Sequence, residues 1–151
     1  MPSSIKIIDT DMGWNNIVRN IGKMDLIIKI GLFGEGASPK NNIAARGAVH
    51  HFGAPSAKIP ARPFMSQAFD NGDQKLKKFI TTQYKGVIDG KISAKTMMDD
   101  IGIFHTNQIQ DTIRNGNFVA LKEETKRRKG SSKPLIDKAI MVGSVKHIIK
   151  K

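Results

Sequence analysis

The adjacent histidines His50 and His51 are the first side chains in this sequence whose chemistry could serve catalysis or metal binding. Neighbouring residues of a helix point about 100° apart, so these two imidazoles cannot chelate one ion together. No carboxylate stands at helical spacing from them to complete a metal site. The pair is therefore expected to be buried or hydrogen-bonded within a helix, and no metal site is predicted there.

The remaining groups of reactive residues are equally weak signals. Asp99 and Asp100 are adjacent, and side chains at i and i+1 of a helix do not face each other, so we expect them on a solvated face. The glycines of residues 31–36 match neither the G-x-G-x-x-G nor the P-loop pattern. His105 and His147 have no partner close in the sequence, and the chain contains no cysteine. The sequence therefore predicts a protein that is not an enzyme and that holds no cofactor and no metal.

The chain is strongly basic, and most of the excess charge lies in its last quarter. Its 151 residues contain 25 Lys and Arg against 13 Asp and Glu, a formal net charge of +12. Between Arg114 and Lys151 there are eleven cationic residues and three acidic ones. The predicted basic partner surface is the cluster Lys126, Arg127, Arg128, Lys129 and Lys133.

Composition leaves three interpretations of this basic cluster open. It is a solvated loop, a surface that meets an acidic protein, or a surface that neutralises nucleic-acid phosphates. Aromatic residues make up 6% of the chain and none lies within the cluster, so a platform that stacks bases is not expected.

The hydrophobic pattern predicts a single α+β domain over residues 1–151, in which a small antiparallel β-sheet is flanked by long α-helices. The first expected elements are a short strand-like run at 5–8, a helix over 14–21 capped by Thr10 or Asp11, a strand over 25–33 and a helix from Asn41 or Asn42 to about residue 51. An extended proline-rich connector over 54–63 is expected to lead into a long helix from 63 to about 87, with a kink or a break at 70–73. The last expected elements are a helix over 93–115, a short basic helix over 122–129 and a strand over 144–149.

Loops and termini complete this expectation. Mobile loops are expected near residues 34–41, 54–62 and 119–133, where glycine, proline and polar residues gather. No apolar run approaches the roughly 20 residues that span a bilayer, and the N-terminus lacks the apolar stretch of a secretory signal. The sequence therefore predicts a soluble protein made inside the cell.

Three stretches, in a fixed order, resemble the neck and tail-completion family of tailed bacteriophages, also described as virion morphogenesis or minor tail-component proteins. The first runs from Ile30-Gly31-Leu32 to the segment 44–53, AARGAVHHFG, after a variable loop. The second is the segment 59–65, IPARPFM. The third is the segment 113–121, IRNGNFVAL, followed by KPLID at 133–137. The resemblance covers roughly residues 25–150, and the pair IPARPF and KPLID is its most specific part.

The resemblance implies a structural virion protein without catalysis. It implies a ring at the head–tail junction, six copies being the family expectation, that joins the tail to connector, neck and tail-tube proteins and leaves a channel for DNA. The protein is then expected in the virion, after assembly in the host cytoplasm, with no membrane partner. One departure stands after KPLID, where Lys138-Ala139 replaces the usual Thr-Gly, so a helix is expected to continue through Met141. The alternative function is that of a small basic nucleic-acid-binding protein.

Two of the family motifs also have a physical interpretation. The first is an interface arm formed by Ile59, Pro60, Arg62, Pro63 and Phe64. Its prolines stiffen the approach to the long helix, Phe64 is expected to be the first core anchor, and Arg62 is expected to point outward toward a neighbouring subunit. The alternative is that this segment only positions its helix. In the second motif, KPLID, Leu135 and Ile136 are expected to pack into the core while Asp137 caps the next turn, and the alternative is direct contact with a partner.

Overall fold

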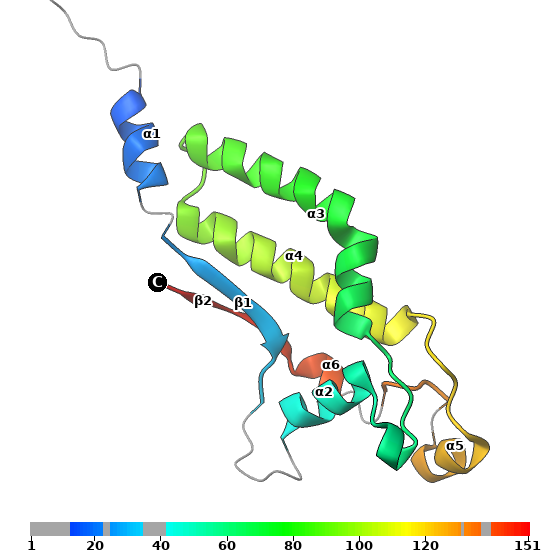
Figure 1. Ribbon diagram of the computed structural model, residues 1–151. Helices are drawn as coiled ribbons and strands as arrows, with labels where there is room; N and C mark the ends of the chain where they lie inside the picture. Colours follow the sequence, from blue (N-terminus) through cyan, green and yellow to red (C-terminus); the bar gives the residue numbers. More distant parts are fainter. Residues whose placement is uncertain (1–12, 23–24, 35–41, 131, 137–139) are drawn as a thin grey trace, which may run out of the picture.

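A computed structural model describes residues 13–22, 25–34, 42–130, 132–136 and 140–151. Its elements are α1 (Trp14–Ile21), β1 (Ile27–Leu32), α2 (Ile43–Phe52), the single 3-10 turn η1 (Pro55–Ala57), α3 (Phe64–Ile88), α4 (Ala94–Asn115), α5 (Glu123–Lys129), α6 (Ile140–Gly143) and β2 (Val145–Lys150) (Figure 1). The expected α+β class is confirmed, since these helices flank one small antiparallel sheet. No helix in the described ranges is long and apolar enough to cross a membrane.

The sheet joins the first and the last strand of the described chain. Strands β1 and β2 pair antiparallel, with Ile27 opposite Lys150 and Leu32 opposite Val145. Because side chains alternate along a strand, one face of the sheet is apolar and half-buried while the other carries Lys29 and Lys146 into solvent. The apolar face lies against α4.

Helix α4 is the centre of the molecule. It packs against α3 on one side and against the sheet on the other, so the three form layers (Figure 1). Its N-terminus is capped as the sequence predicts: the Ser93 hydroxyl accepts a hydrogen bond from the Thr96 backbone N–H at 3.0 Å. Asn42 caps α2 in the same way, through the Ala45 N–H at 3.1 Å.

The buried side chains form two clusters along the α3–α4 pair. One holds Leu76, Val87, Met97 and Ile101 between the two helices. The other lies where α2, α3, α4 and α6 meet, and its members are Ile43, Phe64, Ala68, Ile109, Ile113, Leu135, Met141, Val142 and Val145. The segments that carry the family resemblance pack against this second cluster.

Two local expectations are corrected. Helix α3 runs unbroken through residues 70–73, so the expected alternative of a break is wrong, while the helix bends along its length in Figure 1. Gly72 is buried, and a Cβ there would meet the Gln108 side chain of α4. The connector 54–63 is not fully extended, because Pro55 starts the turn η1 and Ala54 and Ile59 then exchange backbone hydrogen bonds. Proline fixes φ near the helical value, so it favours the first position of such a turn.

Some expectations fall outside the described residues. These are the strand-like run at 5–8, the cap at Thr10 or Asp11, and most of the loop near 34–41. Within the described part, α1 begins after Gly13, whose φ of 88° is left-handed and which makes no side-chain cap.

Candidate functional site

The segments that carry the family resemblance meet at the end of the molecule where α2, α5 and α6 lie (Figure 1). They line a pocket of about 1000 Å³, here called the α2–α5 pocket. Arg46 and His50 come from α2, Ile59 and Arg62 from the connector, and the remaining walls from residues 119–122, α5, Leu135 and α6. The first motif ends at residue 53 and the third begins at residue 113, and folding brings residues of both to one site.

Arg62 does not point outward, and this corrects the expectation for the arm. It is 4% exposed, and its Nε donates a hydrogen bond to the Val119 carbonyl at 3.1 Å. Its backbone N–H donates to the His50 carbonyl at 2.8 Å, which turns the connector back onto α2. A long arginine side chain can bury its stem when the guanidinium finds an acceptor, and the sequence does not reveal that acceptor.

Arg62 is a buried charge that has no carboxylate partner among the residues that the structure describes. Within the described part of the chain it forms no ion pair, and burial alone lowers its pKa from the ordinary value. A buried charge is ordinarily compensated by a partner of opposite sign. Arg62 therefore marks a place that suits an anion.

The rest of the arm is divided between the pocket and the core. Ile59 and Pro60 line the pocket, while Pro63 stands before the first residue of α3. Phe64 is fully buried, as expected, and the edge of its ring meets the His51 ring at a centroid distance of 5.3 Å.

Only some residues of the predicted basic surface line the pocket. Arg128 and Lys129 line the pocket, whereas Lys126 forms an ion pair with Glu123 at 2.6 Å. The Lys133 Nζ donates to the Arg114 carbonyl at 3.0 Å, and Arg127 is exposed. The cluster is therefore not one uniform face: two of its cations line the pocket, and one of them, Lys129, donates from its Nζ to the Pro134 carbonyl at 3.3 Å.

The KPLID motif supplies the pocket floor. Leu135 is buried and belongs to the same core cluster as Phe64, as expected, and Ile136 is half-buried. Asp137, expected as a cap, lies outside the described residues.

The α2–α5 pocket is strongly cationic. The described residues that line it include no Asp or Glu, and they include six cations: Arg46, Lys58, Arg62, Lys122, Arg128 and Lys129. Burial, and then the positive charges of nearby cations, lower the pKa of His50, so this histidine stays neutral in the pocket wall. Its Nδ1 is buried and finds no hydrogen-bond partner in the part of the chain that the structure describes.

The other histidines are held by local contacts. The His51 Nε2 lies 3.3 Å from the Ser66 hydroxyl, and the His105 Nδ1 lies 3.0 Å from the Gln108 Oε1. No group of three His, Cys, Asp or Glu side chains that could hold a metal ion occurs in the ranges that the structure describes.

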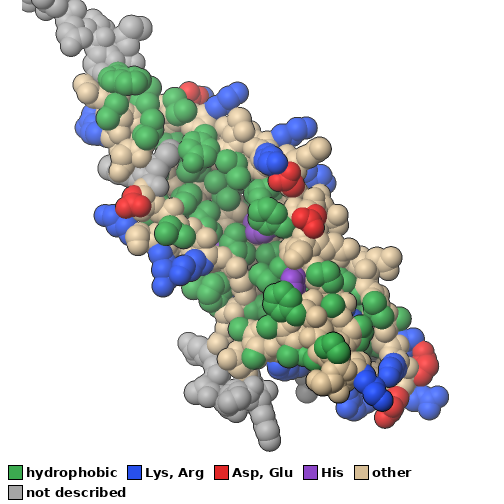
Figure 2. Space-filling model, in the orientation of Figure 1, with side chains coloured by type: hydrophobic (Ala, Val, Ile, Leu, Met, Phe, Trp, Pro, Cys, Tyr) green, Lys and Arg blue, Asp and Glu red, His purple; other side chains and the backbone are tan. Residues whose placement is uncertain are grey.

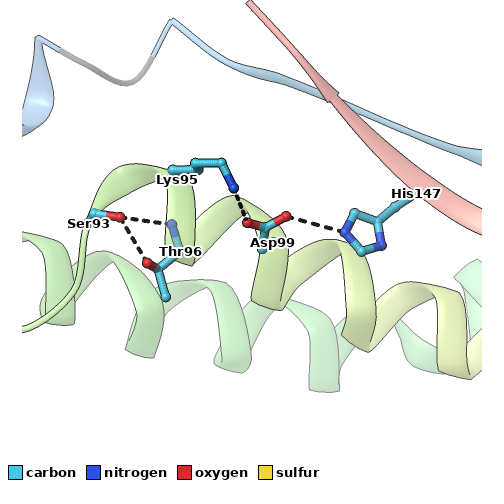
Figure 3. Close-up of polar contacts among 5 residues, drawn as sticks. All are labelled: Ser93, Lys95, Thr96, Asp99 and His147. Carbon is cyan, nitrogen blue, oxygen red and sulfur yellow. Dashed lines mark hydrogen bonds and ion pairs between the residues drawn. The ribbon is translucent and has the colours of Figure 1, made fainter.

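One polar contact could not be predicted from the sequence. The His147 Nε2 on β2 lies 3.5 Å from an Asp99 carboxylate oxygen, and the Lys95 Nζ lies 2.8 Å from the other oxygen (Figure 3). The hydrogen bond from Lys95 is the main cause that lowers the pKa of Asp99, and His147 adds to it. Asp99 and His147 are 48 positions apart, so no spacing rule signals their contact. The contact ties the sheet to α4.

Searches of protein-family models, of curated proteins and of solved structures find no match to this chain.

Proposed function

We propose that this chain is a structural protein of the head–tail junction of a tailed bacteriophage, a ring-forming neck or tail-completion component. It joins the tail to connector proteins, leaves a channel for DNA and catalyses no reaction. The proposal starts from the order of the motifs at 44–53, 59–65, 113–121 and 133–137.

One observation carries the proposal beyond sequence resemblance. Residues from all three stretches line the α2–α5 pocket, among them Arg46, Ile59, Val119 and Leu135. A set of motifs that served only separate local turns would not need to converge on one surface. Convergence on an open, charged pocket is typical of a binding surface.

The exposed apolar residues support ring formation. Trp14, Val18 and Ile21 form a stripe on α1 and are 65%, 49% and 49% exposed. At the other end of the molecule, Phe52 is exposed at the last position of α2, and Val119 is exposed in the lining of the pocket. Figure 2 shows hydrophobic side chains on the surface of the α1 end and cationic ones at the α5 end. A ring needs two different surfaces on each subunit, since each copy meets the next head to tail.

The test is to locate the chain in particles. Tailed particles produced from the genome that encodes it are purified, their proteins are identified by mass spectrometry, and the neck is imaged by electron microscopy. We expect a fixed number of copies at the head–tail junction and particles without joined tails when the gene is deleted. Complete, infectious particles that lack the chain would contradict the proposal.

The second candidate, a basic nucleic-acid-binding protein, is favoured by one observation. Arg127 and Arg128 are exposed on α5 next to one another in a chain of net charge +12. This function requires duplex binding that weakens steeply with salt and that is lost when both arginines are changed to glutamine. Binding that is unchanged by salt and by these substitutions would exclude this second function.

A further inference from the structure

We propose that the α2–α5 pocket binds a carboxylate of an acidic peptide segment with apolar neighbours, and that Arg62 is its main ligand. The inference rests on the proposed function for the source of the peptide, a neighbouring protein of the junction. The binding chemistry itself depends on the pocket alone.

The first step is the state of Arg62. Arg62 is a lining residue of the pocket, is 4% exposed, and donates from its Nε to the Val119 carbonyl at 3.1 Å. No ion pair to it exists within the described residues. The planar fork of arginine matches a carboxylate through two parallel hydrogen bonds, and such a partner would compensate the buried charge.

The second step is the field around Arg62. Arg46, Lys58, Lys122 and Arg128 also line the pocket, and the described lining residues include no acid. A hollow lined by one sign of charge concentrates the opposite charge. The anion therefore meets several cations on its way in and one buried cation inside.

The third step is His50, which stands in the wall beside Arg62. Its Nδ1 is buried and has no hydrogen-bond partner among the described residues, although buried polar atoms are nearly always satisfied. A neutral imidazole with the proton on Nδ1 can donate to an acceptor. His50 is therefore a second polar group in the wall that Arg62 also lines.

The remaining step separates a peptide from a nucleic acid. Apolar side chains form much of the wall, including Ile59, Val119, Leu135 and Ile140, and none of the described lining residues is Phe, Tyr or Trp for stacking a base. Arg62 lines the pocket and is 4% exposed, so a narrow carboxylate side chain that enters the pocket can reach it, whereas the broad phosphate backbone of a duplex meets only cations that stand out from the surface. An Asp or Glu side chain can enter the pocket, and an apolar neighbour in the same peptide can cover Val119 and Ile140.

The experiment measures binding to the full chain by fluorescence anisotropy. The probe is a labelled peptide with the central sequence Leu-Asp-Leu-Glu between Gly-Ser spacers, and its matched control has Leu-Asn-Leu-Gln. We expect saturable binding of the acidic peptide, weakened by about tenfold or more in the amide peptide. Inorganic phosphate and a short DNA duplex are measured in parallel and should compete poorly.

Three variants locate the binding. Arg62→Met keeps the length of the side chain and should weaken binding by about tenfold or more. Arg46→Gln and Arg128→Gln change exposed lining residues that do not hold the fold, and each should weaken binding by about two- to fivefold. Lys85→Gln removes the same charge from the exposed surface of α3, outside the pocket, and should leave binding unchanged.

The outcomes decide the proposal even if Arg62→Met does not fold, because the other two variants carry the test. Equal binding of the acidic and amide peptides overturns it. Tight duplex binding without peptide binding overturns it in favour of a nucleic acid. Arg46→Gln and Arg128→Gln variants that bind like Lys85→Gln also overturn it. Absence of the chain from virions would contradict the proposed function, but it would not contradict peptide binding by the pocket.

Discussion

At the residue scale, Gly53 fixes where the connector begins and therefore where the pocket wall stands. Its φ of 78° and ψ of 170° lie in a region that is nearly restricted to glycine. A Cβ on Gly53 would stand 2.8 Å from the Ala61 backbone nitrogen and 3.0 Å from the Ile59 carbonyl oxygen. Both are backbone atoms of the connector, so neither can rotate away.

We predict that Gly53→Ala lowers the free energy of unfolding by about 2–4 kcal/mol, since backbone strain and a steric clash act together. Urea unfolding followed by circular dichroism measures the change. Gly130→Ala tests strain alone, because Gly130 has a φ of 65° with open space around it, and about 1 kcal/mol is expected. Gly143→Ala, with neither feature, should be close to neutral. Equal effects at all three positions would contradict this account.

A second prediction at this scale concerns His50 and pH. Burial and the charges of Arg62, Lys129 and Arg46 lower the pKa of His50 from its ordinary value of 6.5, so the unfolded chain binds the proton more tightly than the folded one. Stability must therefore fall as the pH drops below 6.5. In His50→Gln this part of the pH dependence should be smaller, measured as urea midpoints at neutral and mildly acidic pH. Wild-type and variant curves that run parallel would refute the prediction.

The limits of sequence reasoning are clearest at single residues. Phe64 and Leu135 were predictable core residues because each is apolar and belongs to a motif that was expected to pack into the core, and both are buried. Arg62 was predicted to point outward and is buried, because its acceptor, the Val119 carbonyl, is 57 positions away. Local rules describe what a side chain prefers, whereas a distant backbone carbonyl decides whether a charged side chain can be buried.

At the element scale, most helices and both described strands follow from local signals. Ser93 and Asn42 each stand just before an apolar periodic segment, and each caps its helix. The single turn η1 was missed, because three prolines in residues 54–63 suggest an extended segment while Pro55 itself suits the first position of a turn. The convergence of the motifs on one pocket was not predictable, because it depends on how α2, α5 and α6 pack.

The cap of α4 gives the prediction at this scale. Because α4 contacts both α3 and the sheet, a loss at its first turn affects the whole fold. Ser93→Ala removes the acceptor for the Thr96 N–H and should cost about 1 kcal/mol of unfolding free energy. Chemical denaturation measures it, with Ser132→Ala in an exposed loop as the control. A Ser93→Ala variant as stable as the control would show that the cap does not contribute.

At the scale of the whole molecule, the two ends differ in chemistry. The α1 end presents an apolar stripe, and α1 has no buried residue although it lies against α3, where the Asn20 Nδ2 is 3.5 Å from the Val87 carbonyl. The other end presents the cationic pocket and the exposed Phe52 at the last position of α2. A helix that leaves its apolar stripe in solvent is suited to a partner surface. Different ends favour head-to-tail association over a symmetric pair.

We therefore predict that the wild-type chain associates in a concentration-dependent way and that the double variant Trp14→Ser, Ile21→Ser remains a monomer. Both side chains are about half exposed or more, so the variant should unfold at the same temperature as the wild type. Light scattering coupled to size-exclusion chromatography measures the mass, and Ile103→Ser, which alters an apolar side chain 50% exposed on α4, is the matched control. The α1 stripe is not the contact between copies if the double variant associates as the wild type does, or if Ile103→Ser abolishes association equally.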